Sequence, residues 1–172
     1  MQKILLLFFL SWIGIPASGQ DKEVKWITFD QLDSVMKIEP RRVIVDIYTD
    51  WCGWCRVMDR KTYGDEQVAA YINRHYYAIR FNAEGKSPVI FNGRTFEFKP
   101  EINIHSLASE LMLGQRSFPC TVIIEKNLMN VVPITGYMKV KELEPVLKYF
   151  VDGVDQEIPY GEWEQNFKNE WK

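Results

Sequence analysis

The chain has 172 residues, of which 47% are hydrophobic and 26% are charged, the composition of one ordinary globular domain with a short extension. Its 21 basic and 23 acidic residues give a net charge of −2, which leaves no electrostatic basis for binding nucleic acid. Aromatic residues make up 14% of the chain, too large a share for a disordered protein, and three cysteines are too few for a disulfide framework. We therefore expect one compact domain.

The N-terminus has the pattern of a secretory signal peptide. Lys3 precedes an apolar run over residues 4–15, and small residues at 17–19 fit cleavage before Gln20. The alternative is a membrane anchor, but twelve apolar residues cover roughly 18 Å of helix, well short of the ~30 Å hydrocarbon core. We expect residues 1–19 to be removed, leaving a chain with no membrane span that works outside the cytoplasm, most simply in a bacterial periplasm.

Strands and helices are predicted to alternate after the signal peptide. Weak alternation predicts a strand over 24–29, and Asp30 is placed to cap a short helix that runs to Lys37 and stops before Pro40. Residues 43–48 are a nearly continuous apolar run, which is typical of a strand covered on both faces.

The next elements include a hairpin. A helix is predicted to start at Cys52, a second helix covers 66–74, and a strand follows over 76–81. The segment 88–98 is predicted to form a β-hairpin around Asn92-Gly93, because this dipeptide tolerates positive φ.

The remaining elements complete an α/β pattern. We predict a helix over 104–113, strands over 121–124 and 131–134, and a final core helix over 139–151. Helices between strands, with buried strands in the middle, predict a central mixed β-sheet flanked by helices, in a domain spanning 20–152.

A C-terminal tail over 153–172 is also predicted to be helical. It carries Trp163, Phe167 and Trp171 at positions i, i+4 and i+8, which predicts one apolar helical face. We expect this face to pack back against the domain rather than bind a separate partner.

The chemistry is expected at Trp51-Cys52-Gly53-Trp54-Cys55. Two thiols three residues apart on a first helical turn share one face and are close enough to form a disulfide. At the helix N-terminus, free N–H groups and the helix dipole stabilise a thiolate, so the pKa of Cys52 is predicted to fall below the free value of about 8.5. A thiolate with a resolving thiol one turn away is what disulfide exchange requires.

Two alternatives remain open for the cysteine motif. A zinc site needs four ligands, and only Cys120, His75 and His105 are available to complete one, at irregular spacing. The pair could also be an inert structural disulfide. For the redox interpretation we expect no metal and no organic cofactor.

Two further features favour redox chemistry. Asp46 is a carboxylate inside the apolar strand, where burial would raise its pKa and make it an acceptor for the proton that Cys55 must lose; a partly exposed or ion-paired aspartate is the alternative. Phe118-Pro119 opens a later strand, and a proline there indicates a special geometry such as a cis bond. Cys120 is expected to be a small buried residue turned away from the face that Pro119 presents.

The run from Val45 to Cys55, followed much later by Phe118-Pro119, resembles the thioredoxin superfamily. It is most similar to secreted thioredoxin-like proteins and to the C-terminal domain of DsbD-type thiol:disulfide interchange proteins. The resemblance implies a thioredoxin fold over roughly Val24 to Asp152. It also implies four roles, with Cys52 as nucleophile, Cys55 as resolving thiol, Asp46 as buried acid and Pro119 as the cis-proline beside the disulfide.

Several positions depart from the family pattern. Trp54 replaces the proline common in thioredoxins, Cys120 stands where threonine is usual, and the hairpin 88–98 intervenes before the next helix. We expect contact with the substrate from four residues, which are Trp51, Gly53, Trp54 and Phe118. One hypothesis for the hairpin is that three of its residues stand near the thiols and restrict access, which are Phe91, Arg94 and Phe96. The alternative is a hairpin that merely covers the sheet.

The predicted function is a thiol–disulfide oxidoreductase of the cell envelope that reduces or exchanges protein disulfides, with reduction or electron relay favoured over net oxidation. Its partners would be protein disulfide substrates, with a membrane reductant relay as electron donor. The alternative is a non-catalytic thioredoxin-fold interaction module that uses the hairpin and the tail.

Overall fold

The computed structural model describes residues 22–151 and 153–171. The predicted signal peptide, residues 1–19, lies outside these ranges. Within them, no helix combines the length and the apolar character needed to cross a bilayer.

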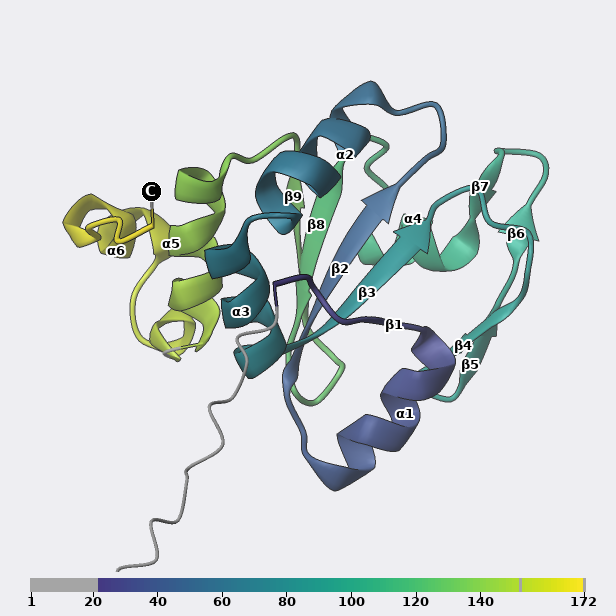
Figure 1. The fold of residues 1–172 in the computed structure, drawn as a ribbon. Helices are drawn as coiled ribbons and strands as arrows, with labels where there is room; N and C mark the ends of the chain where they lie inside the picture. The colour runs from purple at the N-terminus through teal and green to yellow at the C-terminus, as the bar shows by residue number, and fades with distance from the viewer. Residues whose placement is uncertain (1–21, 152, 172) are drawn as a thin grey trace, which may run out of the picture.

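A five-stranded mixed sheet forms the centre of the domain (Figure 1). The strand order is β1-β3-β2-β8-β9, with β3 parallel to both β1 and β2, and β8 antiparallel to both β2 and β9. The strands are β1 (Trp26–Ile27), β2 (Arg42–Tyr48), β3 (Tyr76–Asn82), β8 (Cys120–Ile124) and β9 (Val131–Thr135). The predicted central mixed sheet is confirmed.

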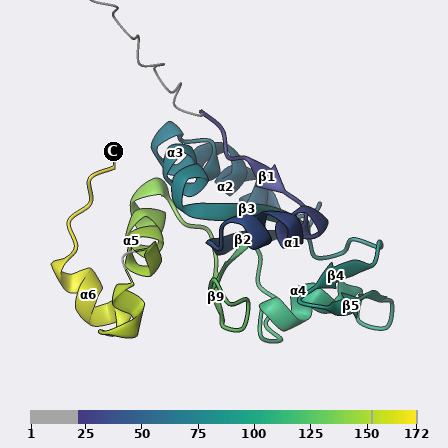
Figure 2. The same ribbon diagram turned by 90° about the horizontal axis from the view of Figure 1, so that it is seen from below.

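Helices cover both faces of this sheet (Figures 1 and 2). One face is covered by α1 (Phe29–Ile38) and α4 (Ser106–Leu111). The other face is covered by α2 (Gly53–Met58), α3 (Glu66–His75) and α5 (Val140–Val151). A π-helical turn, η1 (Asp59–Tyr63), continues α2 toward α3.

Side-chain alternation in β2 divides the core into two layers. Val43, Val45 and Ile47 pack in the layer under α1 and α4, whereas Ile44 packs in the layer under α3 and α5. All four side chains are fully buried, which explains why this strand has a nearly continuous apolar sequence. Asp46 comes two residues after Ile44, so it lies on the face that α2, α3 and α5 cover.

The N-terminal elements differ from the prediction at their boundary. The strand predicted over 24–29 has only two residues, because Thr28 already caps α1. The Thr28 hydroxyl accepts the N–H of Gln31, and the Gln31 side chain accepts the N–H of Thr28. This reciprocal pair satisfies two N–H groups at the helix start. Asp30, the predicted cap, lies in the first helical turn instead.

The inserted hairpin is confirmed and consists of β4 (Val89–Phe91) and β5 (Arg94–Phe96). Its turn residues Asn92 and Gly93 have φ values of 49° and 73°, the left-handed region that the Asn-Gly pair tolerates. The predicted segment 88–98 is slightly too long, because its last residue belongs to another strand.

That other strand changes the start of the following helix. β6 (Phe98–Lys99) pairs antiparallel with β7 (Ile104–His105). Residues 104 and 105 are therefore extended rather than helical, and α4 begins at Ser106. Leu113, the predicted end of the helix, has a φ of 52° and lies beyond it.

The C-terminal tail is helical only in part. It forms a 3-10 turn, η2 (Val154–Gln156), and a short helix, α6 (Tyr160–Asn166). Because α6 ends at Asn166, Phe167 and Trp171 do not share a helix with Trp163, and the single apolar helical face predicted for the three is wrong.

The tail nevertheless packs back on the domain, as predicted. The Trp171 ring lies 5.4 Å from the ring of Tyr71 in α3 and is only 8% exposed. The buried carboxylate of Glu144 in α5 accepts the backbone N–H groups of Glu170 and Trp171. An apolar anchor and a charge-assisted hydrogen-bond pair thus hold the end of the described chain.

Truncating this anchor should destabilise the domain. We expect Trp171→Ala to lower the free energy of unfolding by about 3 kcal/mol, as for other buried large-to-small substitutions. The matched control is Trp54→Ala, because Trp54 is 62% exposed and its loss should cost less than about 1 kcal/mol. Urea denaturation of the oxidised protein measures both, and equal losses would contradict the docking of the tail.

Candidate active site

A disulfide joins Cys52 and Cys55, whose Cα atoms lie 5.3 Å apart. The chain leaves β2 at Tyr48 and turns, with the N–H of Cys52 donating to the carbonyl of Thr49. Cys52 is the N-cap of α2, and its Sγ lies 3.0 Å from the backbone nitrogen of Cys55. The predicted helix start and the predicted proximity of the two sulfurs are both confirmed.

The disulfide lies beside exposed aromatic surface. Cys52 is 5% exposed and Cys55 is 2% exposed, whereas their neighbours Trp51 and Trp54 are 64% and 62% exposed. Cys52 is thus the more accessible cysteine of the two. After reduction, its sulfur would lie where backbone N–H groups and the helix dipole favour a thiolate.

Each exposed tryptophan contacts a second aromatic ring. Trp51 meets Phe118 edge to face, with ring centroids 5.9 Å apart. The ring of Trp54 lies 5.4 Å from that of Tyr137, a residue after β9 that was not predicted for the site. Gly53, between the two tryptophans, begins α2, and a Cβ there would have no neighbour closer than 4.0 Å. Each tryptophan of the motif therefore has one aromatic partner, Phe118 for Trp51 and Tyr137 for Trp54.

The Phe118–Pro119 peptide bond is cis, as predicted for a proline at the head of this strand. The carbonyl of Pro119 accepts the N–H of Gly136 at 2.8 Å, which ties this loop to the segment that carries Tyr137. Cys120 is fully buried in the layer under α1 and α4, the opposite layer from α2, as predicted. Burial raises the pKa of its thiol to about 12.

Asp46 is 1% exposed. Burial raises the pKa of its carboxyl from 3.8 to about 7, against the opposing effect of the Arg80 charge, and the Asp59 charge raises it further. Arg80 Nε lies 3.5 Å from Asp46 Oδ2, and neither Asp46 oxygen has a hydrogen-bond partner among the described residues. The carboxyl is therefore buried, as predicted, and it is also ion-paired, as in the alternative, with Arg80 as the cation.

Arg80 and Asp59 were not among the residues predicted for this site. Arg80 lies opposite Asp46 in the register of β3 and β2, and it also pairs with Asp59 in η1 at 3.1 Å. A charged residue inside the apolar run of β3 is the same signal that identified Asp46, so Arg80 was within reach of sequence reasoning. Asp59 had no such signal, because it follows a helix as an ordinary polar residue.

The ligands considered for zinc are not brought together. No group of three or more His, Cys, Asp or Glu side chains in the described ranges is arranged to hold a metal ion. His105 caps α4, where its Nδ1 accepts the N–H of Leu107 and burial lowers its pKa. His75 packs against the ring of Tyr71.

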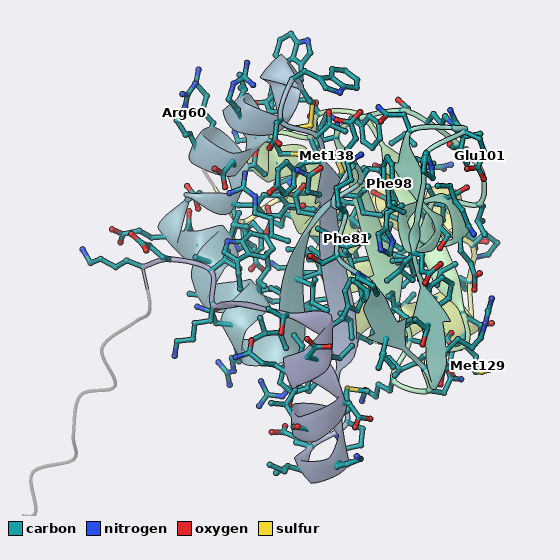
Figure 3. The ribbon with its side chains drawn as sticks, turned by 90° about the vertical axis from the view of Figure 1, so that its right-hand side faces the viewer. Arg60, Phe81, Phe98, Glu101, Met129 and Met138 are labelled. Atoms are coloured by element: carbon teal, nitrogen blue, oxygen red, sulfur yellow. A yellow bond between two sulfur atoms is a disulfide. The ribbon has the colours of Figure 1, made fainter. Side chains whose placement is uncertain are left out.

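The hairpin does not stand near the thiols, so that prediction is wrong. Phe91 packs on Phe29 at the start of α1, and Arg94 pairs with Glu110 of α4 at 2.7 Å. Figure 1 shows β4 and β5 beside α1, while α2 lies at the other end of the sheet. In Figure 3 the disulfide, a yellow bond, is near the top, whereas Met129, which borders the same pocket as the hairpin, is near the bottom.

The position of the hairpin beside α1 has a physical cause. The chain does leave β3 at the edge where the thiols lie, but it then turns back along the sheet. Burial of Phe91 and Phe96 in the α1 layer, at 9% and 5% exposure, outweighs any tendency of the segment to remain at that edge.

Solved structures with the same fold support this architecture. A thioredoxin-fold protein from Helicobacter pylori matches with a TM-score of 0.58 and 16% identity, over 83% of this chain and 84% of that chain. A thioredoxin from Thermus thermophilus matches with a TM-score of 0.55 and 14% identity, over 74% of this chain and 87% of that chain. A DsbH oxidoreductase matches with a TM-score of 0.50 and 14% identity, over 78% of this chain and 83% of that chain. At these identities the likeness shows the fold, which is the thioredoxin fold that the sequence motifs implied.

No curated protein sequence matches this chain. A family model does match, over residues 17–157, and its description reads Thioredox_DsbH, protein of unknown function, DUF255. The match spans the sheet, both helical layers and the cysteine motif. The chain therefore belongs to the DUF255 (Thioredox_DsbH) family of the thioredoxin superfamily.

Proposed function

We propose that this protein is a thiol–disulfide oxidoreductase that reduces or exchanges protein disulfides through its Cys-Gly-Trp-Cys pair. The observation that carries the proposal is the position of Cys52, which caps α2, is bonded to Cys55 and adjoins exposed aromatic surface. An inert structural disulfide needs neither a position at a helix N-cap nor exposed tryptophans, Trp51 and Trp54, beside its two buried cysteines.

In the first step the reduced protein attacks its substrate. The Cys52 thiolate displaces one sulfur of the substrate disulfide, forming a mixed disulfide and releasing the other sulfur as a thiolate, which takes a proton from water. The N–H groups at the start of α2 stabilise the attacking thiolate before this step.

In the second step the protein releases the substrate. Asp46 accepts the proton of the Cys55 thiol, the Cys55 thiolate attacks Cys52 Sγ, and the remaining substrate sulfur leaves as a thiolate. The substrate has gained two electrons, and the Cys52–Cys55 disulfide has formed. A pKa of about 7 suits Asp46 to this role, because it allows the carboxyl to bind and release a proton near neutral pH.

Substrate contact is assigned to the surface around the disulfide. Trp51 and Trp54 are exposed, Phe118 packs on Trp51, and Gly53 lies between the tryptophans. We assign Pro119 to the same surface, because it directly follows Phe118, whose ring packs on Trp51. These groups favour an extended, partly apolar polypeptide over a small charged disulfide.

The place of action is proposed to be the cell envelope, most simply the periplasm. The proposal rests on the signal-peptide pattern of residues 1–19. Exposed thiols tend to be oxidised there, so repeated reduction requires an electron donor, for which we propose a dithiol relay in the membrane.

Turnover of a model protein disulfide tests this function. With dithiothreitol as donor, the purified protein should accelerate the reduction of insulin, and alkylation of the reduced protein with iodoacetamide should abolish the acceleration. Under the alternative, a non-catalytic interaction module, insulin reduction would run at the dithiothreitol background both before and after alkylation. That outcome would overturn the proposal.

A further inference from the structure

We propose that Asp59 is a positioning residue of this site, which holds the Arg80 guanidinium and so limits how fully Arg80 pairs with Asp46. The inference rests on the proposed function, in which Asp46 accepts the proton of Cys55. Asp59 itself touches neither the cysteines nor the substrate in this scheme.

Arg80 lies closer to Asp59 than to Asp46. The ion pair from its Nη1 to Asp59 Oδ1 spans 3.1 Å, whereas the ion pair from its Nε to Asp46 Oδ2 spans 3.5 Å. Arg80 Nε has no hydrogen-bond partner among the described residues, and the guanidinium lies over the Tyr48 ring at 4.7 Å. The cation is thus held on Asp59 and Tyr48, and the buried carboxylate receives only a long ion pair.

A π-helical turn places Asp59 for this contact. η1 directly follows α2, and such turns are rare and frequent at functional sites. At one end of η1, Asp59 holds Arg80, and at the other the Tyr63 hydroxyl lies 2.9 Å from Thr121 Oγ1. Arg80 and Thr121 are the two residues opposite Asp46 in the neighbouring strands. One turn therefore contacts both neighbours of Asp46.

The titratable groups that interact with Asp46 come from three elements. β3 contributes Arg80, η1 contributes Asp59 and the phenol of Tyr63, and β8 contributes the thiol of Cys120, whose pKa of about 12 leaves it uncharged at neutral pH. Burial raises the pKa of Tyr63 well above its ordinary value, so this phenol is uncharged at neutral pH. Burial is the largest influence on the pKa of Asp46, and Arg80 and Asp59 are the charged groups that act on it with opposite signs.

Removal of Asp59 should therefore free Arg80 to pair with Asp46. A complete ion pair would stabilise the Asp46 carboxylate and make it a weaker base. A weaker base takes the Cys55 proton less readily. The contact between Arg80 and Asp59 thus preserves the basicity of the buried carboxylate.

The test is an NMR titration of the Asp46 carboxyl carbon in the oxidised, full-length protein. Asp59→Asn should lower the pKa of Asp46 by about one pH unit, and Arg80→Gln should raise it. In the Arg80→Gln background, Asp59→Asn should lower the pKa of Asp46 by less than half of the decrease that it causes in the wild-type background. Asp59→Glu should restore the wild-type value. Glu110→Gln is the matched control. It removes one charge from the exposed ion pair between Arg94 of β5 and Glu110 of α4, and it should leave the pKa of Asp46 unchanged.

Two results would overturn the inference. One is an unchanged Asp46 pKa in Asp59→Asn. The other is an equal decrease in both backgrounds, which would make Asp59 a bare charge that does not act through Arg80. The titration needs no turnover, so its result is independent of the insulin assay. Failure of that assay would overturn the proposed function, whereas failure of the titration would overturn only the role of Asp59.

Discussion

Cys52→Ser should reduce disulfide turnover to the uncatalysed rate, whereas Cys55→Ser should stop the reaction after the first attack. Cys52 caps α2, where free N–H groups favour a thiolate, so we expect it to be the residue that attacks a substrate disulfide first. A serine hydroxyl is not ionised at neutral pH and cannot displace a sulfur. Cys55→Ser keeps the attacking thiolate but lacks the group that resolves the intermediate.

Non-reducing gel electrophoresis separates the two variants. Cys55→Ser should accumulate disulfide-linked adducts with its clients, and mass spectrometry would identify these clients. Cys52→Ser should form none. The matched control is Cys120→Ala, which removes the third thiol from the opposite layer of the core and should retain turnover. Adducts on Cys52→Ser and none on Cys55→Ser would reverse the assigned order of the thiols.

The geometry around the cysteines was predictable because local sequence determines it. A strand that runs into a short turn and then a helix places Cys52 at the N-cap whatever the rest of the chain does. A proline at the head of a buried strand likewise indicated a special geometry at Phe118–Pro119, and this peptide bond is cis. The cap of α1 was also readable, because Thr28 and Gln31 have the capping-box spacing, although the adjacent Asp30 was the prediction.

Long-range packing accounts for what the sequence did not reveal. The path of the hairpin depends on Phe91 meeting Phe29, residues that lie far apart in the chain. The position of Trp171 depends on the Glu144 carboxylate, whose partners follow it by more than twenty residues. The pairing of Arg80 with Asp59 requires both the register of β2 with β3 and the π-helical turn, for which no local sequence rule exists. Local motifs therefore identified the thiols but not the charges that surround Asp46.

Asp46→Asn should change the pH dependence of stability more than any other single substitution at this site. The pKa of the Asp46 carboxyl is 3.8 without burial and about 7 in the folded protein. Between these values the folded state binds more protons than the unfolded state, so the free energy of unfolding falls as pH rises. One pKa unit corresponds to about 1.4 kcal/mol, so this single group contributes a loss of about 4 kcal/mol between pH 4 and pH 8.

The asparagine variant should lack this loss, because its side chain does not titrate. Urea denaturation of the oxidised wild type and variant, at pH 4 and pH 8, isolates the effect as the difference between the two proteins. The absolute stability of the variant is not diagnostic, because a buried amide also needs hydrogen-bond partners. Arg80 keeps its pairing with Asp59 in the variant, so no unpaired cation confuses the comparison.

In turnover, Asp46→Asn should slow the resolution of the mixed disulfide by about 10²-fold at pH 7, the usual contribution of a general base. The contrary outcome is a difference in free energy of unfolding between wild type and Asp46→Asn that does not vary with pH. Asp46 would then be ionised in the folded protein already at pH 4. A carboxylate so acidic is too weak a base to take the proton of Cys55.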